Sequence, residues 1–239
     1  MKDFKDFWPW WRRIGLLANR QKRRAFRLFK SFPALAYDTV VDLGAYKGEF
    51  TDAAIAVLNP RRLILVEADP VSVRKLEEKY KCNERCSVHS NAITNRGGPV
   101  KLRINSHRDS SSILPINKIS ERIFGKKMEE IKEIEVNGVT LDDLFLQNQL
   151  TRVDLLKADI QGAEHLMIEG GKEALQRTNS LYIEVCFEEF YQGSFKFHEL
   201  DNLLCEIGFK LRSFHECRLG SDHCLAYANA LYLKQNKIS

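Results

Sequence analysis

Residues 40–50 read VVDLGAYKGEF, an apolar run that leads through an acidic residue into a turn holding Gly44 and Gly48. Glycine has no Cβ, so we expect this turn to leave room for a ligand against bare backbone. A dinucleotide site would show G-x-G-x-x-G here, with a second glycine that admits the pyrophosphate. Tyr46 stands at that place, and no Gly-Lys-Ser/Thr of a P-loop follows. The turn therefore favours a ligand with a neutral or cationic centre, near the carboxylate of Asp42.

Around this turn the chain alternates apolar strands with helical segments, which is typical of a parallel sheet covered by helices. We predict an α/β fold with a doubly wound, mostly parallel sheet. The expected strands are 39–44, 62–69, 86–93, 153–160 and 180–187, and the expected helices are 49–58, 70–81, 162–177 (interrupted at Gly170-Gly171) and 196–208. A hairpin is expected after the NRGG run at 95–98, then a short strand, an Asn137-Gly138 turn and a helix over 134–149, and a closing antiparallel pair over 209–216 and 225–233.

The length of 239 residues fits one α/β domain, or one domain with an appendage, and 44% hydrophobic and 29% charged residues are ordinary for a globular protein. Residues 105–133 are polar and have the composition of a loop insertion. The chain shows no apolar run long enough to span a bilayer and no secretory signal pattern. The six cysteines lack the spacing of a disulfide framework, so we expect reduced thiols in a cytoplasmic protein.

Charge divides the chain into two parts. Residues 1–35 hold ten Lys or Arg against two Asp, a local charge of +8, so the total of +5 leaves −3 for the remainder. We predict a basic amphipathic helical arm at 1–36 and the main domain at 37–239. Tryptophans beside arginines in residues 9–30 would suit a peripheral contact with the inner membrane face, but packing on the domain or on a partner subunit is the favoured alternative. The acidic main domain makes nucleic acid an unlikely partner.

Glu67 supplies the next indication, because it ends the second expected strand 25 residues after Asp42. A carboxylate at this place can accept hydrogen bonds from both hydroxyls of a ribose. A ribose site beside an acidic glycine turn matches S-adenosylmethionine better than NAD.

Several stretches together resemble one family. VVDLGAYKGEFT, LVEADP, SNAI, VTLDDL, DLLKADIQGAEHLMIEGG and YIEV, in this order, resemble the FkbM family of S-adenosylmethionine-dependent methyltransferases over about residues 38–212. The resemblance implies the Rossmann-like, seven-stranded sheet of class I methyltransferases, and O-methylation as the usual chemistry. It is weak over 105–133 and does not reach residues 1–36. The family more often has Asn where Tyr46 stands, and often Glu where Gln161 stands.

From their positions, we assign the residues of the turn and of the strand ends to different parts of the cofactor. Gly44, Ala45 and Tyr46 are expected at the methionyl part with Asp42 nearby, Glu67 at the ribose, Ala68, Asn91 and Ala92 at the adenine, and Asp159 facing the sulfonium or the incoming hydroxyl.

A hydroxyl acceptor benefits from a base that takes its proton, and we consider Asp159 and Glu164 as candidates, with His107 third. The alternative for Glu164 is a helix-start carboxylate, and His107 is more simply a solvated loop residue. Ser110, Ser111 and Ser112 would contact an acceptor or be ordinary loop residues. Zinc ligation by His215, Cys217, His223 and Cys224 is not expected, because the spacing fits no usual zinc pattern.

The hypothesis from sequence is an S-adenosylmethionine-dependent O-methyltransferase that acts on a hydroxyl of a sugar, polysaccharide or glycolipid. One alternative is an RNA methyltransferase with the same cofactor. Another is a non-catalytic adaptor that keeps the fold, although the presence of Asp42, Gly44, Glu67 and Asp159 argues against it.

Overall fold

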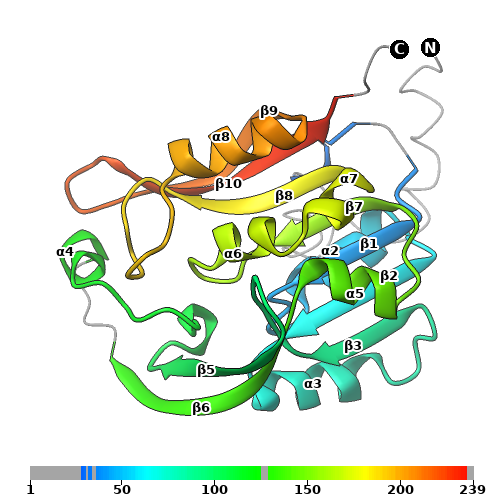
Figure 1. Ribbon diagram of the computed structural model, residues 1–239, viewed down its shortest axis with the longest axis horizontal. Coiled ribbons are helices and arrows are strands. Elements are labelled where there is room, and N and C mark those ends of the chain that lie inside the picture. Colours follow the sequence, from blue (N-terminus) through cyan, green and yellow to red (C-terminus); the bar gives the residue numbers. More distant parts are fainter. Residues whose placement is uncertain (1–27, 31, 34–35, 125–128, 236–239) are drawn as a thin grey trace, which may run out of the picture.

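The computed structural model describes residues 28–30, 32–33, 36–124 and 129–235. In this part of the chain, seven strands form one sheet in the order β3-β2-β1-β7-β8-β10-β9 (Figure 1). Neighbouring strands are parallel except β10, which runs antiparallel between β8 and β9. The predicted α/β fold and its terminal antiparallel pair are therefore confirmed. The strands are β1 Thr39–Leu43, β2 Arg62–Glu67, β3 Cys86–Ser90, β7 Val153–Ala158, β8 Thr178–Cys186, β9 Phe209–Leu219 and β10 Leu225–Lys234.

Helices cover both faces of the sheet, because successive strand residues point to opposite sides. Val40 packs in a cluster with helices α2 and α3, whereas its neighbour Val41 packs in a cluster with α5, α6, α7 and α8. Local signals set the helix ends: Asp69 accepts a hydrogen bond from the backbone N–H of Val71 at the start of α3, and Gly208 ends α8 with a φ of 95°. The helices are α2 Glu49–Val57, α3 Pro70–Tyr80, α5 Leu141–Gln147, α6 Glu164–Glu169, α7 Lys172–Gln176 and α8 Phe197–Ile207.

A second, three-stranded sheet corrects three predictions. The expected strand 86–93 is divided at Asn91 into β3 and β4, and β4 (Ala92–Ile93) pairs with β6 (Glu130–Val139) instead of continuing in the main sheet. β5 (Gly98–Asn105) pairs antiparallel with β6 and not with the strand before it. The Asn137-Gly138 pair lies inside β6, where a Cβ on Gly138 would come within 2.9 Å of the Gly98 carbonyl oxygen. This glycine therefore permits a close approach of two strands and makes no turn.

The predicted interruption of the helix over 162–177 is confirmed, since α6 and α7 are separate helices joined at Gly170-Gly171. A Cβ on Gly170 would lie 2.6 Å from the carbonyl oxygen of Thr94, and one on Gly171 would lie 2.7 Å from that of Met167. Gly170 therefore permits a close approach to the segment that follows β4, and Gly171 permits one to Leu141 and to the end of α6.

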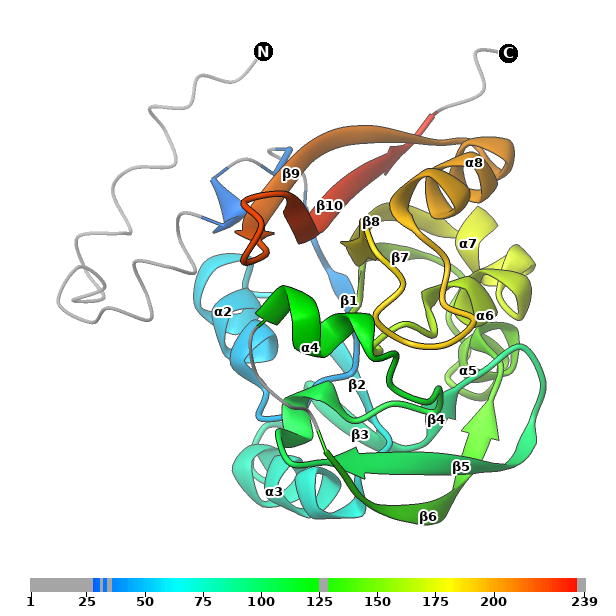
Figure 2. The same ribbon diagram turned by 90° about the vertical axis from the view of Figure 1, so that its left-hand side faces the viewer.

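In the described part of the polar insertion, residues 105–124 and 129–133, the chain forms regular elements and is not simply a loop. It contains a 3-10 turn, η3 (Arg108–Ser110), a helix, α4 (Ile119–Phe124), and the first residues of β6. Residues 107–116, which we call the strap, are bridged to Arg103 on one side and to Tyr191 on the other. Figure 2 shows the insertion lying across the carboxyl ends of the central strands.

The predicted N-terminal arm lies mostly outside the described residues. Its described end is part of the domain core: Phe29 and Phe32 are buried, and the Phe32 ring lies 5.5 Å from that of Tyr182. The boundary at 36/37 and the membrane contact through 9–30 stay predictions. Within the described part of the chain, every helix is too short or too polar to cross a membrane.

Candidate active site

The glycine turn after β1 is shaped by contacts within the protein. Gly44 and Gly48 have φ values of 71° and 74°, a region that favours glycine. A Cβ on Gly44 would lie 1.9 Å from the carbonyl oxygen of Asp159, and one on Gly48 would lie 2.4 Å from the hydroxyl of Tyr80. The space beside both glycines is thus filled by protein, which corrects the expectation of bare backbone kept for a ligand. Gly44 still borders the cleft, together with Tyr46.

Beneath the turn lies a buried ion pair that was not predicted. Asp42 is fully buried and accepts a hydrogen bond from Thr51 Oγ1 at 2.7 Å, and its Oδ1 lies 3.2 Å from Lys157 Nζ. Lys157 also donates to the carbonyl oxygens of Leu43 and Gly44 at 3.0 and 2.8 Å. Burial lowers the pKa of Lys157, but the charges of Asp42 and Asp159 outweigh it and raise the pKa above its ordinary value. Asp42 therefore stabilises the turn through its buried ion pair with Lys157. It does not line the cleft, which corrects its expected place beside the cofactor.

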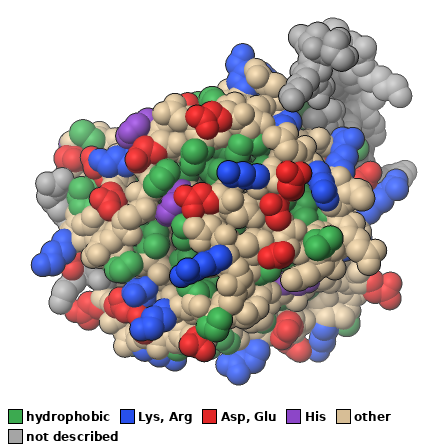
Figure 3. All heavy atoms as spheres, viewed as in Figure 1, with side chains coloured by type: hydrophobic (Ala, Val, Ile, Leu, Met, Phe, Trp, Pro, Cys, Tyr) green, Lys and Arg blue, Asp and Glu red, His purple; other side chains and the backbone are tan. Residues whose placement is uncertain are grey.

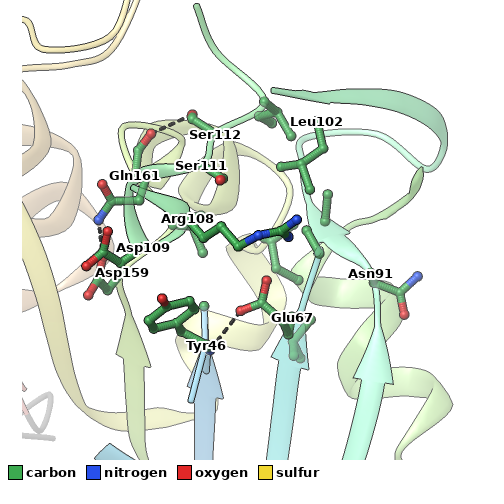
Figure 4. A pocket seen from close by; sticks show the side chains of 17 residues that line it. Tyr46, Glu67, Asn91, Leu102, Arg108, Asp109, Ser111, Ser112, Asp159 and Gln161 are labelled. Carbon is green, nitrogen blue, oxygen red and sulfur yellow. Dashed lines mark hydrogen bonds between the residues drawn. The ribbon is translucent and has the colours of Figure 1, made fainter. Parts of the chain in front are cut away.

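The cleft opens at the carboxyl ends of β1, β2, β4 and β7, with the strap as its outer wall (Figure 4). Most of the predicted cofactor residues meet here. The lining residues are Gly44, Tyr46, Val66, Glu67, Ala68, Asn91, Ala92, Ile93, Leu102, Arg108, Asp109, Ser111, Ser112, Ile113, Asp159, Ile160 and Gln161. Ala45 is the exception along with Asp42, because it is buried in the core on the α2 side of the sheet.

Glu67 lies at the centre of this cleft. Its Oε2 accepts the backbone N–H of Tyr46 at 2.7 Å and its Oε1 accepts that of Asp69 at 2.8 Å. Burial raises the pKa of Glu67, while these two hydrogen bonds lower it, and burial has the larger effect. A carboxylate has about four lone-pair sites, so the group keeps acceptor capacity for ribose hydroxyls.

Apolar side chains next to Glu67 form a slot for a flat ring. Val66, Ala68, Ala92, Ile93 and Leu102 all line the cleft on this side. A carboxylate beside an apolar slot suits an adenosyl group, and the glycine turn lies at the other end of the cleft, where its methionyl part would fit. The residues present therefore fit S-adenosylmethionine.

The strap is fastened on both sides of the cleft. Arg108 pairs with Asp69 at 2.5 Å on the β2 side, and Ser112 Oγ donates to the carbonyl oxygen of Gln161 at 2.6 Å on the β7 side. Burial raises the pKa of Asp69, but the hydrogen bond from Arg108 and those from Val71 and Ser72 lower it below its ordinary value. Figure 4 shows the Arg108 side chain extended toward Glu67. Sequence reasoning missed Arg108, whose only signal was a basic residue within the polar insertion.

The candidate bases have different surroundings. Asp159 is half-buried and lines the cleft. Glu164 is buried at the start of α6, where it accepts the backbone N–H of Ile160 at 2.9 Å, and burial raises its pKa to about 7. It does not line the cleft, so the helix-start interpretation fits it better than a base. His107 is exposed at the start of the strap, as the loop interpretation expects.

Three strap serines differ in their contacts. Ser111 and Ser112 line the cleft, and the carbonyl oxygen of Ser110 accepts the hydroxyl of Tyr191 at 2.9 Å. Of the residues considered for zinc, His215 bonds to Ser213 at 2.8 Å and lies against the Phe32 and Tyr182 rings. No group of three His, Cys, Asp or Glu side chains within the described ranges is arranged to hold a metal.

One acidic residue beyond the cleft was not predicted as a site residue. Glu184, two residues before the end of β8, accepts a hydrogen bond from Gln161 Nε2 at 3.2 Å, and the same nitrogen donates to Asp159 Oδ1 at 2.6 Å. Its signal in the sequence was an acid near the end of an apolar strand, in YIEV, the same signal that singled out Asp159.

A doubly wound sheet with an acidic ribose site at the end of β2 and a glycine turn after β1 defines a Rossmann-like methyltransferase. The family described as methyltransferase FkbM domain matches residues 42–211, and the chain belongs to this family. The protein is therefore an S-adenosylmethionine-dependent methyltransferase.

Similar proteins agree with this assignment. The 2-O-methyltransferase NoeI of Sinorhizobium fredii (strain NBRC 101917 / NGR234) is 29% identical in an alignment of 177 residues, and the match covers 69% of this chain and 70% of that protein. The crystal structure of methyltransferase FkbM from Methylobacillus flagellatus KT has a TM-score of 0.53 and 18% identity, and the match covers 83% of this chain but only 44% of that one. The N-terminal domain of EvdMO1 with bound SAH (S-adenosylhomocysteine) has a TM-score of 0.50 and 11% identity, over 93% of this chain and 84% of that chain. At these identities the two structures show the fold alone.

Proposed function

We propose that this protein methylates a hydroxyl group of a sugar, either free or in a polysaccharide or glycolipid. The observation that carries the proposal is the polar group at the ends of β7 and β8, where Asp159, Gln161 and Glu184 lie next to the cofactor cleft. Carboxylate and amide groups accept and donate the hydrogen bonds that sugar hydroxyls need. The similarity to a 2-O-methyltransferase supports transfer to oxygen.

The charge of this region favours an uncharged acceptor over a phosphate-bearing one. Asp159, Glu164 and Glu184 lie close enough for their charges to interact, whereas the nearby cation Lys157 is buried with Asp42 and Arg108 is paired with Asp69. Figure 3 shows Lys and Arg side chains interspersed with Asp and Glu over the described part of one face, which is unlike a basic nucleic-acid surface. These observations support a glycan acceptor above RNA.

When bound, S-adenosylmethionine supplies a sulfonium-activated methyl group. The protein's own contribution is to align an acceptor hydroxyl with that group, which is how positioning accelerates a reaction between two bound molecules. The strap narrows the cleft and excludes water from one side, while Glu67 and the glycine turn set the position of the donor. Acidic groups at the ends of β7 and β8 also favour a cationic donor and a developing positive charge on the acceptor oxygen.

The test is methyl transfer from labelled S-adenosylmethionine to separate pools of monosaccharides, glycolipids, polysaccharides and RNA. We expect label in a carbohydrate-containing pool, at an ether that acid hydrolysis returns as an O-methyl sugar. Label in RNA alone would contradict the acceptor class. Calorimetry gives the control for the donor: a chain that binds the cofactor but labels no pool fits the adaptor alternative.

A further inference from the structure

Glu184 lies on the acceptor side of the cofactor cleft, in line with Asp159. Ala158 of β7 pairs with Ile183 of β8, so the two carboxylates follow directly from paired positions at the carboxyl ends of adjacent parallel strands. The lining residues place the adenosyl part of the cofactor over β2 and β4, which leaves the ends of β7 and β8 for the acceptor. We propose that Glu184 is the base that takes the proton of the acceptor hydroxyl and that Gln161 positions it, an inference that rests on the proposed O-methyltransferase function.

Gln161 joins the two carboxylates through one amide nitrogen. Its Nε2 donates to Asp159 Oδ1 at 2.6 Å and to Glu184 Oε2 at 3.2 Å, so these two oxygens are at most 5.8 Å apart. The amide orientation is set because Gln161 Oε1 accepts the hydroxyl of Tyr191 at 2.7 Å. The backbone carbonyl of Gln161 is also held, by Ser112 of the strap. Gln161 is therefore a positioning residue that three hydrogen-bond partners hold in place. It donates to Oε2 of Glu184 and leaves Oε1 of Glu184 to accept a proton.

The two carboxylates differ in their suitability as a base. Asp159 Oδ2 lies 3.9 Å from Lys157 Nζ, so this carboxylate already has a cation as its neighbour. Glu184 is half-buried and has no cation in ion-pair contact among the described residues, although the charge of Lys157 lowers its pKa from a distance. Burial, followed by the charges of Asp159 and Glu164, raises the pKa of Glu184 well above its ordinary value. A base works best when its pKa approaches the working pH, and the raised pKa of Glu184 suits this role.

The proposed step is balanced in atoms and charge. The acceptor oxygen forms a bond to the methyl carbon as the carbon–sulfur bond breaks, and the electron pair of that bond stays on sulfur, which becomes neutral. The hydroxyl proton moves to Oε1 of the ionised Glu184 carboxylate. Glu184 then releases this proton to water when the products leave.

The activity test compares Glu184→Gln with Asp159→Asn, using the carbohydrate pool that the wild-type protein labels. We expect Glu184→Gln to lower kcat/KM by about 10² to 10⁴-fold, the usual contribution of a general base. Affinity for S-adenosylmethionine should stay within about two-fold, because Glu184 does not line the cofactor cleft. The exposed Glu206 of α8 gives a matched control, Glu206→Gln, with wild-type rates.

The pH profile distinguishes a base from a structural role. In the wild-type protein the rate should fall at low pH as Glu184 is protonated, and Asp159→Asn should keep this acidic limb whereas Glu184→Gln should lose it. Gln161→Leu should keep the acidic limb but move it to higher pH, because the Glu184 carboxylate loses a hydrogen bond that stabilises its ionised form. A Glu184→Gln variant with wild-type kcat/KM, or with an unchanged acidic limb, would overturn the proposal.

A second measurement needs no acceptor and so separates this inference from the proposed function. Carboxyl groups of glutamate labelled with ¹³C are followed by NMR against pH in the complex with S-adenosylhomocysteine, and the Glu184 signal is identified by its loss in Glu184→Gln. We expect a midpoint above that of the exposed Glu206. A midpoint at or below that of Glu206 would exclude Glu184 as the base even if no acceptor has been found.

Discussion

Replacing Lys157 with methionine should destabilise the protein more than most single substitutions. Its side chain is 9% exposed and its Nζ lies 3.2 Å from Oδ1 of Asp42, whose side chain is 0% exposed. Methionine keeps an unbranched apolar stem of similar length, so packing changes little while the cation is removed. The remaining carboxylate is then buried without a counter-charge, and breaking a buried pair in this way costs about 3–5 kcal/mol.

The other contacts of Lys157 indicate where in this range the loss should fall. The carbonyl oxygens of Leu43 and Gly44 lose a charged donor, and such hydrogen bonds contribute about 1.5–3 kcal/mol. Thr51 still donates to Asp42, which limits the loss. These effects share one site and are not additive, so we expect about 4 kcal/mol in the free energy of unfolding.

Urea unfolding followed by circular dichroism measures this loss, with the exposed Lys172→Met of α7 as the matched control, expected within about 0.5 kcal/mol of wild type. The double variant Asp42→Asn/Lys157→Met removes the stranded charge and should be more stable than Lys157→Met alone by at least about 1.5 kcal/mol. A Lys157→Met variant that loses less than about 1 kcal/mol would refute the reasoning. So would a double variant no more stable than Lys157→Met.

Three further changes test other parts of the site. Glu67→Ala should weaken S-adenosylmethionine binding about 10- to 100-fold in calorimetry, because charged hydrogen bonds contribute about 1.5–3 kcal/mol, and unchanged affinity would contradict the ribose assignment. Tyr46 has a φ of 47°, a backbone conformation that Asn tolerates better than Tyr. Tyr46→Asn should therefore raise the free energy of unfolding by about 0.5 kcal/mol in thermal unfolding, although the contact of the ring with Lys47 is lost. A fall in stability would argue against backbone strain at this position. Glu164 has a pKa of about 7 when folded and near 4.3 when unfolded, so the unfolded chain loses this proton first and stability falls as pH rises between those values. Glu164→Gln should remove that fall. The difference in the free energy of unfolding between variant and wild type should therefore be more favourable to the variant at pH 8 than at pH 4.5, by up to about 3 kcal/mol, and equal pH dependence in both proteins would contradict the raised pKa of Glu164.

The features that were predictable from sequence have local signals. The strand before Gly44, the acid that ends β2 and Pro70 at the start of α3 each depend on residues that are neighbours in the chain. Parallel strands also bring their carboxyl ends to one edge of the sheet, which is why Glu67, Asn91 and Asp159 meet in one cleft as expected.

The features that were missed depend on pairs far apart in the chain. Asn137-Gly138 has the composition of a turn, but its place inside β6 is decided by pairing with Gly98, about forty residues earlier. The ion pair of Lys157 with Asp42 joins β7 to β1, and the pair of Arg108 with Asp69 joins the strap to α3. From sequence alone, each of these residues has the pattern of an exposed charged side chain, because no neighbouring residue indicates its partner.

Backbone strain and function meet at two positions of the cleft. Tyr46 and Gln161 both line it, and both are non-glycine residues with positive φ, 47° and 56°. Such conformations cost about 1–3 kcal/mol and persist only when surrounding contacts hold them. The contacts here are carboxylates: Glu67 accepts the backbone N–H of Tyr46, while Asp159 and Glu184 accept the side-chain amide of Gln161. The groups that we assign to the ribose and to the acceptor proton therefore also keep the two strained residues in place, so their removal should disorder the cleft as well as remove a hydrogen bond. Conservative variants such as Glu184→Gln, which keep the side-chain shape and one oxygen acceptor, are for this reason the ones that separate chemistry from structure.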